Sequence, residues 1–173
     1  DYVSLRGETR AGTIIKPSTG GSGISTSAAI VCGSGCHVSN MTIQHQSGGS
    51  VYATGVYIGS ESYIYLDNLD IKIEGTASTT ASYGVYTTNT SNIHITNIII
   101  NISQGTGTNY GIYCSGTSPE ITNCDITLSA GAASNYGVYN YVSSNSGLFN
   151  TTIRISGATL NVGIKNVESS PTL

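Results

Sequence analysis

The chain has 173 residues, a mass of 17.8 kDa and a formal net charge of −3, which allows one domain with a sizeable core. Only 9% of the residues are charged, and Ser, Thr, Gly and Asn together make up nearly half of the chain. There is no excess of Lys and Arg and no apolar run of about 20 residues, which excludes a basic nucleic-acid-binding protein and a membrane-spanning helix. Thr, Val, Ile and Tyr are abundant while Leu, Glu and Lys are scarce, so the composition predicts an extracellular, β-rich protein.

Two short motifs recur along the chain with the same period. The first reads Thr54-Gly-Val-Tyr57, Tyr83-Gly-Val-Tyr86, Tyr110-Gly-Ile-Tyr113, Tyr136-Gly-Val-Tyr139 and Val162-Gly-Ile-Lys165. The second reads Val38-Ser-Asn40, Leu66-Asp-Asn68, Ile95-Thr-Asn97, Ile121-Thr-Asn123 and Leu148-Phe-Asn150. Both repeat every 26 to 29 residues. Two motifs that keep the same phase over five copies indicate a repeat architecture.

Each repeat contains three short β patterns in chain order. The first is the Gly-Val-Tyr segment, the second runs into the Asn, and the third follows it, as in 98–102. A polar loop of variable length then leads to the next glycine, and no helical pattern separates the strands. Such units stack into a solenoid. A propeller blade needs about 40 residues, more than one repeat supplies, and a β-sandwich would not keep a motif at a fixed period. The sequence therefore predicts an all-β parallel β-helix of about six coils, with three strands per coil.

The whole chain resembles the right-handed, single-stranded β-helix of the pectate lyase superfamily. The opening segments 3–8 and 12–15 are similar to the entry coil of such proteins, and the recurrent Asn resembles that family's asparagine ladder. In lyases and hydrolases of this fold, the resemblance implies an active site on the outer face of the first strand, built from clustered Asp with Arg or Lys and sometimes Ca²⁺. Here the corresponding positions carry tyrosines and no acidic cluster, so a non-catalytic member is indicated.

Alternation with period 2 assigns side chains to the inside or outside of the coils. In the first strand it turns Val56, Val85, Ile112 and Val138 inward. In the second strand the inward column comprises Leu5, Val38, Leu66, Ile95, Ile121, Leu148 and Leu173. The outward column after the glycine comprises Tyr57, Tyr86, Tyr113 and Tyr139. These tyrosines either bind sugars or a protein partner, or stack on one another and stiffen the face.

The Asn column (Asn40, Asn68, Asn97, Asn123 and Asn150) is predicted to be structural. Asn tolerates the left-handed conformation of a sharp turn, and its amide can hydrogen-bond to the coils on either side. Asn40 and Asn150 also begin glycosylation sequons, but both belong to this ladder. Asn89 and Asn101 are better placed to carry a glycan.

Two pairs of residues are catalytic candidates. His94 and Glu120 should lie on adjacent coils, about 5 Å apart, where they form either an acid/base pair or an ordinary surface pair. Asp70 and Asp125 should occupy equivalent outward positions two coils apart, about 10 Å from each other. That separation exceeds the ~5 to 9.5 Å between the carboxylates of glycoside hydrolases.

The four cysteines, Cys32, Cys36, Cys114 and Cys124, match no zinc-binding pattern. They form either one or two disulfides in a secreted protein or buried free thiols. Cys32 and Cys114 should lie too many coils apart to bond to each other. The sequence indicates no metal site and no cofactor.

Residues 1–173 are expected to form a single β-helix domain. The chain has no initiator Met, so we expect it to be a processed piece. We expect it to be either a segment of a longer solenoid or a subunit that stacks head to tail, because a contact without rotational closure builds a fibre.

The sequence therefore predicts a secreted or cell-surface structural protein, adhesive in character. Its tyrosine-lined face would contact a polysaccharide or a protein on a cell surface. Head-to-tail self-association is a further expectation, and no nucleic-acid partner is expected. The competing class is a polysaccharide lyase or glycoside hydrolase acting on an acidic polysaccharide, which only the analogy of fold favours.

Overall fold

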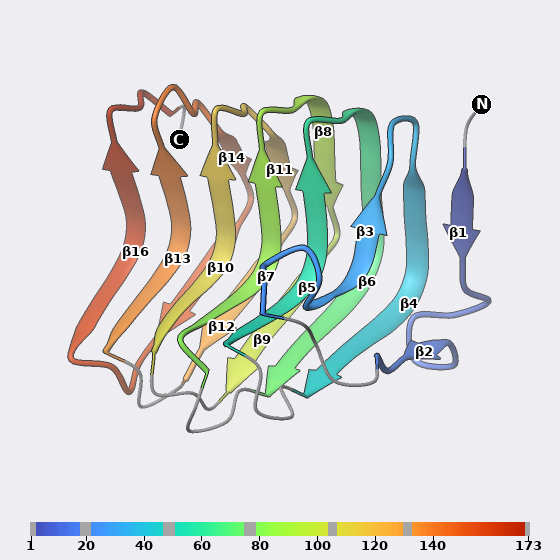
Figure 1. Ribbon diagram of the computed structural model, residues 1–173, viewed down its shortest axis with the longest axis horizontal. Coiled ribbons are helices and arrows are strands. Elements are labelled where there is room, and N and C mark those ends of the chain that lie inside the picture. The colour runs from blue at the N-terminus through green and yellow to red at the C-terminus, as the bar shows by residue number, and fades with distance from the viewer. Residues whose placement is uncertain are drawn as a thin grey trace.

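The computed structural model describes residues 3–17, 22–46, 51–74, 79–103, 107–129 and 133–171. Throughout these residues the regular elements are β-strands, with no helix. The strands wind into a parallel β-solenoid of about five turns, close to the six predicted. Successive coils lie side by side from one end of the molecule to the other (Figure 1). The predicted all-β solenoid is confirmed.

The strands belong to two sheets. One, here called the tyrosine sheet, contains the Gly-Val-Tyr repeats and consists of β3 (Ala28–Cys32), β5 (Tyr52–Gly59), β7 (Ala81–Thr88), β10 (Thr108–Ser115), β13 (Ser134–Tyr141) and β16 (Leu160–Val167). The other, here called the asparagine sheet, consists of β1 (Ser4–Arg6), β2 (Ile14–Ile15), β4 (His37–Gln46), β6 (Ser62–Glu74), β8 (Ser91–Thr96), β9 (Ile99–Ser103), β11 (Glu120–Thr122), β12 (Asp125–Leu128), β14 (Gly147–Phe149) and β15 (Thr152–Ile155). All pairings are parallel and keep equivalent repeat positions in register.

The core is made of rows of identical or similar apolar residues, one from each coil. In one row Ile43, Ile71, Ile100 and Ile126 are all fully buried and in register. Burying one such side chain contributes about 1.5–3 kcal/mol. The inward positions predicted for Val56, Val85, Ile112 and Val138 are likewise confirmed.

The predicted second-strand column is buried from Val38 to Leu148, but its first member is not. Leu5 remains 42% exposed because β1 pairs only with β4 and no strand among the described residues covers its other side. Leu173 lies outside the described residues.

The asparagine column occupies the predicted sharp turn. All five residues have positive φ, between 47° and 56°. In β4 and β6 the strand continues through this turn, whereas in the later coils the turn separates β8 from β9, β11 from β12 and β14 from β15. The Asn68 amide donates to the Asn40 Oδ1 atom at 2.7 Å, and the Asn150 amide donates to the Asn123 Oδ1 atom at 2.7 Å. The structural role predicted for this column is therefore confirmed.

The ladder is interrupted once. The Asn97 amide donates to Asp67 at 3.0 Å instead of to Asn68. The reason is Arg10, whose guanidinium donates to the Asn68 Oδ1 atom through both Nε and an Nη atom, and also to the Asn97 carbonyl at 3.2 Å. The segment before β2 thereby connects two later coils through one side chain.

In Figure 1 the strands β7, β10, β13 and β16 of the tyrosine sheet are bent. Each of these strands contains the glycine of its motif. The glycine and the residue after it both face the interior, because a Cβ atom built on Gly111 would meet the Ile126 Cγ2 atom at 2.5 Å while Ile112 is fully buried. The same Cβ atom would lie 2.5 Å from the carbonyl oxygen of Gly137 in the next coil. At Gly111 only a residue without a side chain fits.

We therefore predict that Gly111→Ala destabilises the protein by about 1–3 kcal/mol or more, because the added methyl group overpacks the core. Gly163→Ala is the matched control: Gly163 has the same place in the motif, but nothing lies within 4 Å of a Cβ atom built on it. Urea unfolding followed by circular dichroism measures both. Equal stabilities of the two variants would contradict this account of the bend.

Candidate binding surface

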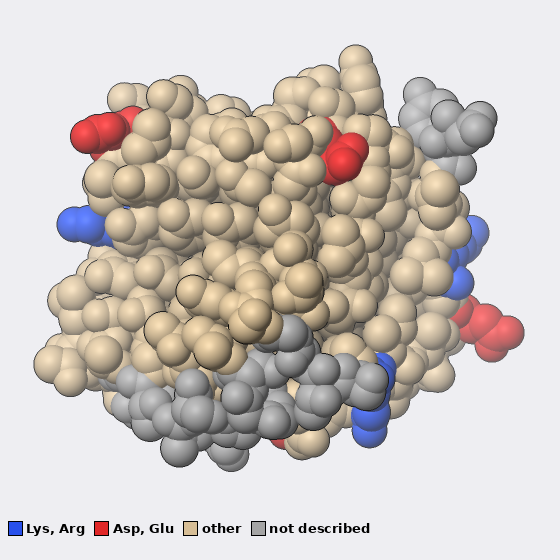
Figure 2. All heavy atoms as spheres, in the orientation of Figure 1, with Lys and Arg blue, Asp and Glu red and all other residues tan. Residues whose placement is uncertain are grey.

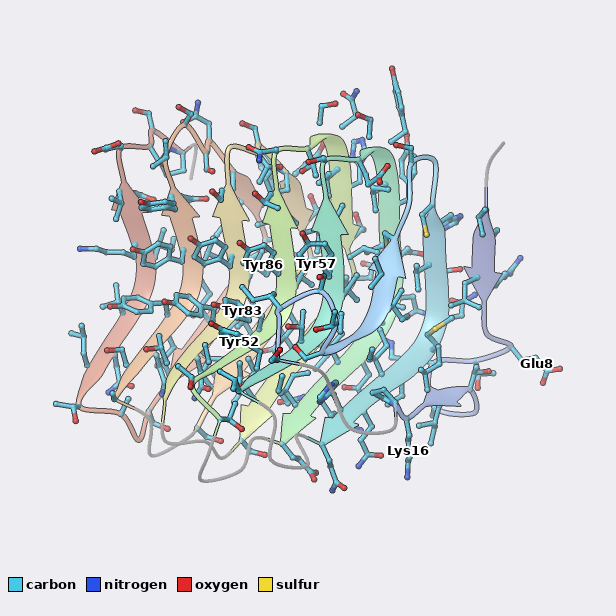
Figure 3. The ribbon with its side chains drawn as sticks, in the orientation of Figure 1. Glu8, Lys16, Tyr52, Tyr57, Tyr83 and Tyr86 are labelled. Carbon is cyan, nitrogen blue, oxygen red and sulfur yellow. The ribbon has the colours of Figure 1, made fainter. Side chains whose placement is uncertain are left out.

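The four tyrosines predicted to form an outward column do so. Tyr57, Tyr86, Tyr113 and Tyr139 come from β5, β7, β10 and β13, where in-register pairing places them next to one another. Their ring centroids are 4.9–5.5 Å apart and neighbouring rings are within 12° of parallel. The column is thus a continuous stack, with Tyr57 and Tyr86 labelled in Figure 3.

A second column of tyrosines runs beside the first. Tyr83, Tyr110 and Tyr136, the residues directly before the glycine, stack on each other with centroids 5.0 and 5.4 Å apart. Each also meets the first column edge to face: the rings of Tyr110 and Tyr113 are 5.2 Å apart at 86°. The two columns therefore interlock.

Sequence reasoning missed this second column, although its residues stand in the repeat motif. Strict alternation turns Tyr83 inward, because it lies two positions before the inward Val85. The glycine bend breaks the alternation and brings Tyr83 and Tyr86, three positions apart, to the same face. The repeated Tyr-Gly-Val-Tyr pattern was the available signal.

Two further tyrosines extend the surface. The ring of Tyr52 lies 6.5 Å from that of Tyr83, and the ring of Tyr141 lies 6.3 Å from that of Tyr139. We call the whole set the tyrosine face; it comprises Tyr52, Tyr57, Tyr83, Tyr86, Tyr110, Tyr113, Tyr136, Tyr139 and Tyr141. Aromatic pairs of this kind contribute about 0.5–1.5 kcal/mol each beyond their buried area.

The stacking decides which parts of the rings can meet a ligand. Within the first column each inner ring has a neighbouring ring on both sides, so its π faces are largely covered. The side chains of the first column are half-buried, and Tyr83 of the second column is buried. Ring edges and hydroxyl groups are what the face offers to solvent.

The tyrosine face is also uncharged. Burial, and after it the neighbouring tyrosines, raises the pKa of Tyr110 from 10.0 to about 12, and the same causes raise the pKa values of Tyr83, Tyr86, Tyr113 and Tyr139. Charged side chains lie toward the margins of this side of the molecule (Figure 2). Beyond Tyr139, the next residue in register is Lys165.

The first pair of catalytic candidates is brought together, but on the asparagine sheet. His94 and Glu120 are in register on β8 and β11, with Nδ1 and Oε2 3.5 Å apart. Both side chains are exposed, at 41% and 55%, and such surface pairs contribute about 0.2–1 kcal/mol. On its other side His94 stacks on Tyr65, with centroids 4.9 Å apart. The pair forms part of an exposed row rather than a cleft.

The second pair is not brought together. Asp70 and Asp125 are each in register with Ile99, which separates them by two coil spacings, about 10 Å. Each carboxylate has its own cation: Lys72 lies 2.9 Å from Asp70, and Arg154 donates to Asp125 at 2.5 Å. The two carboxylates therefore do not form a common site for a glycosidic bond.

The cysteines are free and buried, the second of the alternatives left open by the sequence. Cys32, Ile58, Thr87 and Cys114 occupy successive positions of one register row, so Cys32 and Cys114 are indeed far apart. Burial raises the pKa of Cys114 to about 12 and that of Cys124 to about 11.

The described ranges contain no group of three or more His, Cys, Asp or Glu side chains that could hold a metal ion. They also contain no helix long and apolar enough to cross a bilayer. Asn89 is exposed in the turn between β7 and β8, and Asn101 is half-buried in β9. A glycan at either remains a prediction.

Comparisons with models of protein families, with curated proteins and with solved structures give no match to this chain.

The raised tyrosine pKa values predict a loss of stability in alkali. Because the folded state favours the neutral phenol, these tyrosines stabilise the fold fully below about pH 10. This stabilisation is lost as the pH rises through their pKa values in the folded state, about 12 for Tyr110. We expect tyrosinate absorbance and loss of β-sheet circular dichroism to appear together above pH 10. A Tyr110→Phe variant should show a shallower decline. Ionisation of the tyrosine face near pH 10 in an intact fold would contradict the prediction.

Proposed function

We propose that this protein is a structural β-solenoid at the cell surface or outside the cell, and that its tyrosine face binds a neutral glycan. The observation that carries the proposal is the continuous, uncharged face of interlocked tyrosines, which extends over β5, β7, β10 and β13. The resemblance to the pectate lyase superfamily, whose members act on polysaccharides, also supports a carbohydrate ligand.

The chemistry of the face limits how such a ligand binds. Because the ring faces are occupied by stacking, a sugar contacts ring edges and exchanges hydrogen bonds with the row of phenol groups. The raised tyrosine pKa values keep these groups neutral, so they can donate as well as accept. A polysaccharide rich in carboxylates would find no row of cations here. An enzyme acting on an acidic polysaccharide is accordingly less well supported, since Asp70 and Asp125 do not share a site.

The test separates hydroxyl contacts from ring contacts. Replacing Tyr86 and Tyr113 with Phe keeps the stack and removes two hydroxyls, whereas replacing both with Ser removes the rings. We expect both double variants to lower retention on neutral glycans of an array at least about tenfold, as loss of central contacts does at other interfaces. Tyr63→Ser is the control, because Tyr63 is an exposed tyrosine on the asparagine sheet.

Unchanged retention by a correctly folded Ser variant would eliminate the tyrosine face as a glycan site. Binding of a protein but of no glycan by the wild type would assign the face to a protein partner instead.

A second role, end-to-end self-association, is favoured by the first and last coils described. β1, β2 and β3 form one open edge and β14, β15 and β16 the other, at opposite ends of the stack. Three of the inward rows that run between these edges begin and end on apolar residues: Leu5 and Leu148, Ile15 and Ile153, and Ile30 and Ile164. A second copy stacked in register would continue each row.

If copies stack in this way, the sedimenting mass should rise with protein concentration and Leu5→Lys should abolish the rise, because it places a charge in the joint. Tyr63→Lys adds the same charge away from both edges and should have no effect. A wild-type protein that stays monomeric at every concentration would refute end-to-end association.

A further inference from the structure

Two of the four cysteines border a single tight turn. Cys32 ends β3, Cys36 immediately precedes β4, and the sequence between them is Gly33-Ser-Gly35. The Cys36 amide donates to the Gly33 carbonyl at 3.2 Å, and Gly35 adopts a φ of 71°. Both cysteines are buried, at 2% and 8% exposure. The turn therefore holds two thiols close together at the wall of the core.

Cys36 lies close enough to influence the ionisation of Cys32. Burial is the main cause of the raised pKa of Cys32, and the neighbouring Cys36 side chain and then the Glu61 carboxylate add to it. The other cysteines have different surroundings. Cys114 lies three register steps from Cys32, and the Cys124 thiol donates to the Ile95 and Thr122 carbonyls.

We propose that Cys32 and Cys36 are a disulfide-forming pair, which closes a covalent ring of five residues across the β3–β4 turn when the protein meets a disulfide oxidant. Residues four apart across a tight turn can bring their Cα atoms within the 4.4–6.8 Å that a disulfide requires. The alternation of the flanking strands turns both side chains toward the core, so the bond forms without reversing either strand.

With glutathione disulfide as the oxidant, the exchange balances in two steps. The Cys36 thiolate, the more exposed of the two, attacks glutathione disulfide and forms a mixed disulfide with release of one glutathione thiolate. The Cys32 thiolate then displaces the second glutathione and closes the ring. The two cysteine protons end on the two released glutathione thiols. Because burial raises the pKa of Cys32, the second step is expected to be slow.

The bond would strengthen a junction between coils. From the same turn, Gly35 donates its amide to the Ser62 carbonyl at 2.9 Å, and the Ser34 hydroxyl donates to Glu61 at 2.5 Å. Both acceptors belong to the following coil. Covalent closure of the turn would hold these donors in place near the open edge that β3 forms.

The test uses the full chain under native conditions. The protein is incubated with glutathione disulfide, then denatured and alkylated, and its free thiols are counted and mapped by mass spectrometry. We expect two of the four thiols to be lost, with one bond between Cys32 and Cys36 and no glutathione retained. Retention of all four thiols, a lasting mixed disulfide, or bonds that involve Cys114 or Cys124 would overturn the proposal.

Two variants complete the experiment. Cys36→Ala should abolish the intramolecular bond, while Cys124→Ala, which also removes one buried thiol, should still lose two thiols. Loss of two thiols to an intramolecular bond in Cys36→Ala would show that another pair reacts and would refute the assignment. If a variant does not fold, the thiol count and the mapped bond of the wild-type protein alone decide whether Cys32 and Cys36 form the disulfide.

Discussion

In-register hydrogen bonding between parallel strands of successive coils is the interaction on which the rest of this structure depends. It places each residue directly against its equivalent one repeat away, at about 4.8 Å. Whatever one coil carries at a given position therefore meets the same position of the next coil. Isoleucines pack on isoleucines in the core, asparagine amides bind asparagine amides at the turn, and tyrosines stack on tyrosines outside.

This constraint also explains the unusual composition. A charged residue repeated at one position would stack like charges at the coil spacing, which is unfavourable, whereas Ser, Thr, Asn and Tyr can stack with their own kind. Among the described residues, three carboxylates lie beside a basic side chain: Asp125 beside Arg154, Asp70 beside Lys72, and Glu120 beside His94. The scarcity of charge leaves the tyrosine face, which is the proposed binding surface, neutral.

Positions set by the period and by regular alternation were predictable from the sequence, and positions set by the bend of the backbone were not. The outward tyrosine column and the asparagine turn follow from a period that sequence alone displays. The second tyrosine column did not follow, because the bend at residues such as Gly111 arises from the close approach of the Gly137 carbonyl and the Ile126 side chain. Alternation of side chains holds only while a strand is straight.

The sequence by itself determined the solenoid, its register and most of the rows, because motifs that recur in phase have one way to stack their equivalent positions. Only the tertiary structure decided where that regularity is broken. Arg10 interrupts the asparagine ladder from a segment 58 residues away in the chain, and the glycine bend adds a row of tyrosines to the outer face. The same is true of the cysteines. Their spacing left several pairings open, and the short turn between Cys32 and Cys36 and the register that places Cys114 in another coil distinguish this pair from the rest. These features depend on contacts between residues distant in sequence or on the local path of the backbone, which periodicity does not encode.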